Sequence, residues 1–204
     1  MNRVWNLLLT FVFVVALCGC NSTEDENLDQ RDDIVSYLES THSPKLISES
    51  AALASLDEAP AFYSTTGRTT FRYISTYYDE DRDSKATIKK GSKIEVTLSL
   101  YDFTSMTTPS ASTVLFSNDS DIIDELITLS EDRFTGEYWS SDLLSITVGD
   151  GSLFGGVETL LVGCKEDDVI EFYMTLDEAY GSSVLGVVTE QAPLAMFCKI
   201  VTVN

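Results

Sequence analysis

The sequence predicts an α+β domain in which an antiparallel sheet packs around one short helix, preceded by an N-terminal extension with a short helix of its own. Apolar and polar residues alternate at 71–75, 94–100, 170–176 and 194–200, which is the period of half-buried strands. One stripe at helical spacing lies between the second and third stretches and consists of Phe154, Val157, Leu160, Leu161 and Cys164. One amphipathic helix among several strands favours a sheet with the helix on one face.

The first twenty residues have the pattern of an export signal. A basic start at Arg3 precedes an apolar run over 7–17, which is too short to span a bilayer as a stable helix. The run ends in the sequence LCGC at 17–20, which resembles a bacterial lipobox. The resemblance implies cleavage after Gly19 and lipidation of Cys20. The expected location is therefore the cell envelope, at the periplasmic or surface face of the outer membrane. The alternatives are an ordinary secretory signal and a signal anchor.

The composition is strongly acidic. The chain has 204 residues with 33 acidic and 13 basic side chains, for a formal net charge of −20, and removal of 1–19 takes away one of the basic residues. A surface this negative repels phosphate backbones and anionic headgroups, so we expect no nucleic acid partner. The sequence offers no basic patch for a membrane, and we expect attachment to the membrane through the N-terminal lipid.

Composition also divides the chain into four segments. They are a signal peptide at 1–19, an acidic tether at 20–33, an extension at 34–67 and the main domain at 68–204. The tether holds Leu28 as its only large apolar residue, so we expect it to be solvated and unfolded. An acidic stretch after a lipidated cysteine resembles the surface-export signal of Bacteroidetes-type lipoproteins, and a plain spacer is the alternative.

The extension carries two weaker helix signals. Asp32 and Asp33 precede a short apolar group, which predicts a capped helix over about 33–41. A helical turn is expected near 48–56. The chain's single histidine, His42, lies outside the strand-rich region, and we expect it on the surface rather than in a catalytic or zinc site.

Two cysteines remain after the signal is removed and Cys20 takes the lipid. Cys164 and Cys198 fall on predicted apolar faces, and they form either a disulfide or, as the sequence favours, two separate core residues.

Acidic residues at 79, 81 and 83 have the spacing that begins a calcium loop, but Ser84 and Lys90 occupy the positions of its glycine and its bidentate glutamate. A solvated hairpin turn is therefore favoured, and we expect no metal and no organic cofactor.

A series of motifs follows in fixed order along the second half of the chain. They are Gly149, Leu153-Phe154, Gly156, Ala179-Tyr180-Gly181 and Pro193-Leu194, preceded upstream by Lys90-Gly91, the segment IEVTLSLYDF at 94–103 and Leu115-Phe116-Ser117-Asn118. Their order resembles that in the FKBP-type peptidyl-prolyl cis-trans isomerases. The resemblance covers about 68–204, with an insertion near 119–142. It implies a curled antiparallel sheet wrapped around one short helix.

The resemblance also implies a site for a proline-containing polypeptide. The hydroxyl of Tyr180 and the main-chain N–H of Phe154 would donate to a substrate carbonyl, and Phe116 would join Tyr180 in catalysis. The substrate-binding residues that it implies are Leu98, Ser117, Leu144, Ile146, Leu153, Phe154, Val157 and Met196. This set describes an apolar cup of the size of a proline ring with a phenol at its rim.

Four positions of this cup differ from the residues of active family members. Val157 replaces a Trp, Leu98 a Tyr, Met196 a Phe, and Ser117 an acidic residue. The cup is therefore wider and less aromatic, which reduces the contact area for a proline ring. Two functions stay open: an isomerase that assists the folding of envelope proteins, and an inactive binding or structural module with the same fold. The sequence leaves the oligomeric state open.

Overall fold

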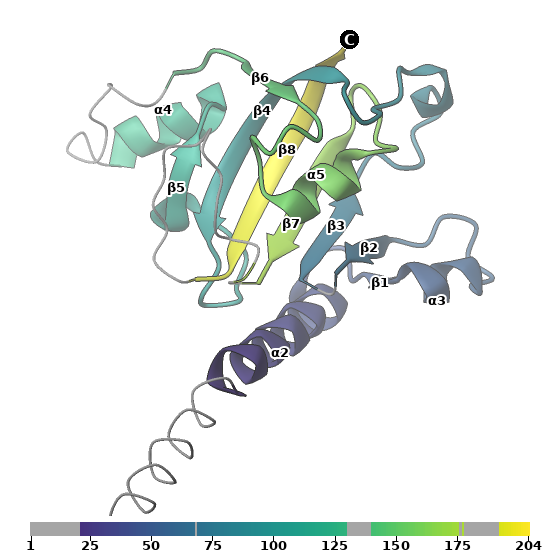
Figure 1. Cartoon of the computed structure of the whole chain (residues 1–204), viewed down its shortest axis with the longest axis vertical. Coiled ribbons are helices and arrows are strands. Elements are labelled where there is room, and N and C mark those ends of the chain that lie inside the picture. Colours follow the sequence, from purple (N-terminus) through teal and green to yellow (C-terminus); the bar gives the residue numbers. More distant parts are fainter. Residues whose placement is uncertain (1–20, 68, 130–139, 176, 178–191) are drawn as a thin grey trace, which may run out of the picture.

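A computed structural model describes residues 21–67, 69–129, 140–175, 177 and 192–204 of the chain (Figure 1). The described part is a mixed α+β structure with an eight-stranded sheet and four α-helices. The predicted signal peptide, Cys20, Leu176 and Tyr180 lie outside the described residues. Of the helices in these ranges, none has both the length and the apolar composition that crossing a bilayer requires.

The sheet is antiparallel except at one edge, where β1 pairs in parallel with β2. Its strands run in the order β1-β2-β3-β7-β8-β4-β5, and β6 pairs with β4 beside β5. The strands are β1 (Ile47–Ser48), β2 (Phe62–Thr66), β3 (Thr70–Ile74), β4 (Lys93–Asp102), β5 (Val114–Ser117), β6 (Leu144–Thr147), β7 (Val169–Met174) and β8 (Leu194–Val203). The four strands predicted from alternation are thereby confirmed as β3, β4, β7 and β8.

One face of the sheet, which we call the α5 face, packs against the helix α5 (Gly155–Leu161). Figure 1 shows α5 lying across the strands on this side. Alternate strand residues point toward the helix, as the period of two requires. The buried strand residues of this face include Ile94, Val96, Leu98, Leu100, Ile146, Ile170, Phe172, Met174, Leu194, Met196, Cys198 and Ile200. The predicted helical stripe supplies the other side of this core, so the expected packing of sheet and helix is confirmed.

The opposite face, which we call the outer face, is covered at one end by the N-terminal extension. The helix α2 (Asn21–Ser36) continues into a π-helical turn, η1 (Tyr37–Thr41), and the pair lies below the sheet in Figure 1. Ile34, Tyr37 and Leu38 are buried there. They pack with Leu46, Tyr63, Phe71, Tyr73, Tyr101, Phe103, Tyr173 and Ala195 in a second core.

The prediction of an unfolded tether over 20–33 is wrong for its described part, because residues 21–36 form α2. The segment contains several good helix formers, including glutamates, a glutamine and an arginine. Its C-terminal end is held on the sheet by Ile34, and a helix that is anchored at one end no longer bears the full cost of nucleation. The helix predicted over 33–41 is confirmed as the end of α2 together with η1.

The rest of the extension is part of the same sheet. The helical turn expected near 48–56 is confirmed as α3 (Glu49–Leu53), which begins after the side chain of Ser48 accepts a hydrogen bond from the Ala51 N–H. β2 pairs with β3, so the predicted boundary at 67/68 falls between two paired strands. The insertion begins with a helix that the sequence analysis did not predict, α4 (Ser120–Leu129), which buries Leu126.

The expectation that His42 lies on the surface is wrong. Its side chain is buried, with Nε2 2.9 Å from Glu171 Oε2 and Nδ1 2.5 Å from the Pro44 carbonyl oxygen. The cause is the docking of η1 onto the outer face, which brings the residue after it against β7.

Cys164 and Cys198 are buried and free, so their interpretation as core residues is confirmed. Burial raises the pKa of the Cys164 thiol to about 11.

The acidic turn at 79–83 has structural partners. Arg82 begins a short 3₁₀ turn (Arg82–Ser84) and its guanidinium binds both oxygens of the buried Asp168, at 2.7 and 2.8 Å. Asp81 lies 3.2 Å from Lys85, and Asp83 lies 2.9 Å from Lys165. The pairs of Arg82 with Asp168 and of Asp83 with Lys165 connect the turn after β3 to the segment that precedes β7.

Candidate functional site

The predicted catalytic and substrate-binding residues that the structure describes come from six places in the fold. Leu98 lies on β4, Phe116 and Ser117 on β5, and Met196 on β8. Leu144 and Ile146 lie on β6, Leu153 and Phe154 on the loop before α5, and Val157 in α5. Tyr180, the residue that the resemblance places at the rim, lies outside the described residues.

The described apolar members gather in the α5-face core. Its fully or almost fully buried members from the predicted set are Leu98, Ile146, Leu153, Phe154, Val157 and Met196. Phe116 and Leu144 are partly exposed and pack against that core. The strand register explains part of the arrangement, because Leu100 of β4 is paired with Met196 on one side and with Phe116 on the other. The predicted walls therefore form one continuous apolar group around α5.

Ser117 differs from the other predicted wall residues because its hydroxyl already has partners. The Ser117 hydroxyl lies 2.7 Å from the Ser99 hydroxyl on the paired strand, and it accepts a hydrogen bond from the Asp119 N–H at 3.0 Å. The side chain is fully buried. In this arrangement Ser117 joins β5 to β4, which positions the neighbouring Phe116.

Asn118 is a further positioning residue at the end of β5. Its side-chain oxygen accepts from the Leu98 N–H at 2.6 Å, and its amide nitrogen donates to the carbonyl oxygens of Val96 at 3.0 Å and Asp142 at 2.9 Å. The residue is buried and connects the end of β5 with β4 and with the segment that precedes β6. The sequence analysis included Asn118 in a motif but did not assign it this role.

Glu158 fixes the loop that carries Leu153 and Phe154, and the sequence analysis missed it. Its carboxylate is buried and accepts hydrogen bonds from the N–H groups of Gly151 at 3.2 Å and Leu153 at 3.0 Å. Phe154 is the residue directly before α5, and the Glu158 N–H donates to its carbonyl oxygen at 2.9 Å. An acidic residue in the first turn of a mostly apolar helix was the available signal, since a negative charge is favourable there.

The described wall offers apolar contact and no ionisable group. Its apolar side chains can exclude water from a bound apolar group, and the loop that Glu158 holds gives that wall a defined shape. Within the described ranges, histidine, cysteine, aspartate and glutamate nowhere form a group of three or more that could hold a metal ion. The chemistry that these residues can perform is therefore the binding and desolvation of an apolar segment.

No protein-family model matches the chain, and no curated protein matches it.

Proposed function

We propose that the chain is a lipid-anchored, FKBP-type peptidyl-prolyl cis-trans isomerase-like protein of the bacterial envelope that assists the folding of envelope proteins. The order of strands, loop and helix in the described part agrees with the order that the motifs imply. The curled sheet around a short helix in the FKBP family is the fold proposed for residues 68–204.

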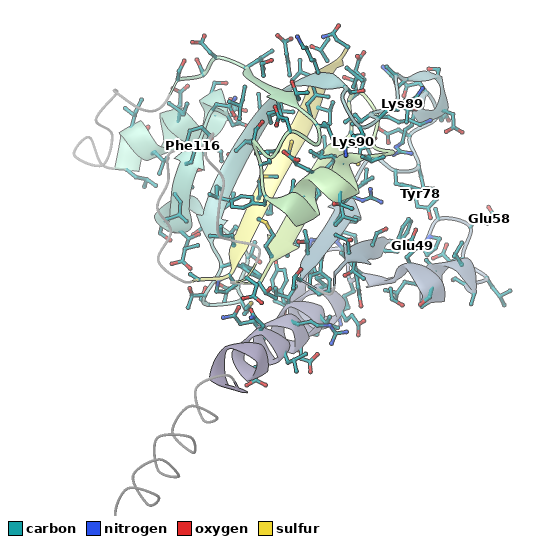
Figure 2. The ribbon with its side chains drawn as sticks, in the orientation of Figure 1. Glu49, Glu58, Tyr78, Lys89, Lys90 and Phe116 are labelled. Atoms are coloured by element: carbon teal, nitrogen blue, oxygen red, sulfur yellow. The ribbon has the colours of Figure 1, made fainter. Side chains whose placement is uncertain are left out.

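One observation carries this proposal. Residues selected by the resemblance from positions 98 to 196 meet in one apolar cluster beside α5. Phe116, one of the two proposed catalytic residues, lies at the partly exposed margin of that cluster. Figure 2 labels Phe116 on the β5 side of the molecule. A proline ring placed against Phe116 would lie at the margin of the same cluster.

Isomerisation of a prolyl bond needs no nucleophile or metal. Amide resonance sets a barrier of roughly 18–20 kcal/mol, and a catalyst can lower it by binding the twisted imide more tightly than the planar one. An apolar wall favours the twisted form, because the planar amide is the more polar of the two. In this proposal Tyr180 and the Phe154 N–H hold the substrate carbonyl while Phe116 contacts the ring.

The second candidate is an inactive binding or structural module, and the burial of two residues favours it. Val157 and Met196 are fully buried, and both replace aromatic residues of active family members. Side chains without exposed surface offer no contact area to a ligand unless the site opens. The same fold would then serve as a scaffold on the envelope.

A protease-coupled isomerisation assay on the full chain, kept in one mild detergent, separates the two functions. For the isomerase we expect acceleration of cis-to-trans conversion in a proline-containing peptide. That acceleration should fall at least about tenfold in Phe116→Ala and in Tyr180→Phe, since each removes a contact made at the twisted bond. Leu129→Ala, an exposed position on α4, is the matched control and should keep the rate. Absence of acceleration by a folded wild-type chain supports the inactive module.

The anchor is tested separately. Cys20→Ala should move the protein from the membrane fraction to the soluble fraction of cells that express the full chain. Cys18→Ala is the control, because the predicted cleavage removes that residue. Unchanged membrane partition of Cys20→Ala contradicts lipidation at this position.

A further inference from the structure

A cavity lies at the β2–β3 edge of the sheet, away from the proposed isomerase site. Its volume is about 200 Å³. Phe62 and Ser64 of β2 and Arg72 and Ile74 of β3 line it together, because the register places alternate residues of both strands on the α5 face. The segment 59–61 before β2 and the turn after β3 complete the lining.

The turn after β3 gives this cavity an aromatic wall. Tyr77 makes edge-to-face contacts with Phe62 and with Tyr78, each at 5.0 Å between ring centroids. The Tyr78 hydroxyl donates to the Pro60 carbonyl oxygen at 3.2 Å, which joins the two loops of the lining. Both tyrosines keep exposed surface, 38% for Tyr77 and 47% for Tyr78. Figure 2 shows Tyr78 on the side of the molecule where the extension meets the sheet.

Arg72 brings a positive charge into this aromatic cavity without a carboxylate partner in the described part of the chain. Its guanidinium donates to the Leu160 carbonyl oxygen at 2.5 Å and to the Ser64 hydroxyl at 3.2 Å, and it lies 3.5 Å from Cys164 Sγ. All three partners are uncharged. The carbonyl belongs to the last turn of α5, where a positive charge is favourable.

The other sheltered cations of the described part do have carboxylate partners. Arg82 binds Asp168 at 2.7 Å, and Lys165 binds Asp83 at 2.9 Å. The chain contains 33 acidic residues against 13 basic ones, so a carboxylate partner for a partly buried arginine would be easy to supply. A guanidinium presents five N–H donors in a planar fork suited to a carboxylate. The charge of Arg72, which has no carboxylate partner among the described residues, therefore points to an anion from outside the chain.

We propose that this cavity binds a small organic carboxylate with one apolar ring, its carboxylate on Arg72 and its ring against Tyr77 and Phe62. The volume agrees with this size, since an engineered cavity of about 150 Å³ in another protein accepts benzene. The aromatic wall matches a ring, because ring pairs prefer edge-to-face and offset contacts. This inference goes beyond the proposed function and does not depend on it.

Isothermal titration of the full chain, in one mild detergent, tests this site with three probes of equal ring size. The probes are benzoate, neutral benzyl alcohol and cationic benzylamine. We expect benzoate to bind about tenfold to a hundredfold more tightly than benzyl alcohol, because a hydrogen bond to a charged group is the stronger kind. Equal affinity for the first two probes, tighter binding of benzylamine, or no saturable binding of benzoate would overturn the proposal.

Two kinds of variant locate the binding. Arg72→Met should weaken benzoate binding about tenfold or more and leave benzyl alcohol unchanged. Because Arg72 also holds the Leu160 carbonyl, Ala59→Trp provides an independent test: Ala59 is exposed and lines the cavity, so a large ring there fills the space without entering the core. Ala54→Trp, exposed and outside the lining, is its matched control. Benzoate binding that survives Ala59→Trp, or that Ala54→Trp abolishes equally, places the ligand elsewhere and overturns the proposal.

Discussion

On the α5 face of the sheet the buried strand side chains are mostly aliphatic, whereas on the outer face aromatic rings enclose a hydrogen-bonded histidine. The α5 face is covered by a helix that lies between strands in the sequence, and the outer face by the segment before the first strand. The α5 face is thus held mainly by apolar burial. The other combines apolar burial with a polar network that must be complete to be stable.

The network on the outer face centres on His42 and Glu171. Both ring nitrogens of His42 face acceptors, the Pro44 carbonyl and the Glu171 carboxylate, so the protonated ring, which donates from both nitrogens, satisfies both contacts. The Tyr173 hydroxyl donates to the same carboxylate oxygen at 2.5 Å. The rings of Tyr37, Tyr73 and Tyr173 surround the imidazole at 5.8, 5.3 and 6.2 Å between centroids.

Because of this difference, we expect the two faces to respond differently to destabilising substitutions. Loss of an apolar residue on the α5 face removes contacts that join several strands to the helix, so the whole domain should lose stability. Loss of a residue under the extension should release the extension first, because few elements other than α2 and η1 depend on it.

The largest effect is expected for Phe172→Ala on the α5 face. Phe172 is fully buried in the middle of β7, and removal of a buried phenyl ring typically costs about 3–5 kcal/mol. Chemical denaturation of the full chain, followed by circular dichroism, should show one transition at a much lower denaturant concentration. Val169→Ala, an exposed position on the same strand, should change the free energy of unfolding by less than about 0.5 kcal/mol. A comparable loss in both variants contradicts the assignment of Phe172 to the core.

The α5 face was predictable from the sequence because its signals are local. Alternation placed Leu98, Phe172 and Met196 on one face of their strands, and helical spacing placed Val157 opposite them. Each of these patterns can be recognised within about ten neighbouring residues of the sequence. The same reasoning predicted β3, β4, β7 and β8. It missed β1, β2, β5 and β6, which are at most five residues long and hold few alternating apolar residues.

The outer face was not predictable in the same way, because its main contact is distant in sequence. His42 and Glu171 are 129 residues apart, and no local pattern pairs them. Tyr173 alternates with core residues and was placed opposite the α5 face, which is where it lies. The burial of Tyr173 depends on η1, and no pattern in the sequence predicted that this segment would pack against the outer face. The position of Glu158 was equally hidden, because a carboxylate that binds loop N–H groups looks the same in sequence as an exposed one.

The second prediction concerns Leu38→Ala under the extension. Leu38 is fully buried between η1 and the outer face, and its truncation typically costs about 2–5 kcal/mol. Because the loss is confined to the docking of the extension, hydrogen exchange of the full chain should accelerate in residues 27–46. Protection in β4 and β8 should persist.

Leu28→Ala is the matched control for this prediction, since Leu28 lies on α2 with about half of its side chain exposed. It should leave exchange in residues 27–46 unchanged. If Leu38→Ala instead loses exchange protection in β4, in β8 and in the extension at the same time, the two faces unfold as one unit. That result would contradict the separate unfolding of the extension.

The third prediction concerns pH and the outer face alone. Burial lowers the pKa of His42, but hydrogen bonds to Glu171 and to the Pro44 carbonyl outweigh it, so the pKa lies above its ordinary value. A raised pKa in the folded state means that the stabilisation is complete below the unfolded value of about 6.5 and is lost as pH rises through the folded value. Thermal unfolding should therefore show a melting temperature that falls as pH rises from about 6.5 toward 9.

His42→Gln separates this effect from other titrations. The chain has one histidine, so this variant removes the only imidazole that titrates in that window. We expect it to be less stable than the wild type by about 1.5–3 kcal/mol below pH 6 and to show a flat melting temperature between pH 6.5 and 9. A wild-type melting temperature that stays level or rises over this range contradicts an imidazolium at position 42.

The smallest effect is expected for Glu158→Gln, which tests the buried carboxylate that holds the loop before α5. The amide keeps one acceptor oxygen but loses the charge, so the bonds to the Gly151 and Leu153 N–H groups weaken and one of them is lost. We expect a loss of about 1 kcal/mol and faster amide exchange at Gly151 and Leu153, with no dependence on the pH window of His42. Glu125→Gln, exposed on α4, is the matched control and should change neither quantity. Unchanged exchange at both loop amides in Glu158→Gln would mean that the loop is held by its own turn. The hydrogen bonds of the Glu158 carboxylate would then be dispensable for the loop before α5. A polar network that is required for stability would in that case distinguish the outer face from the loop before α5.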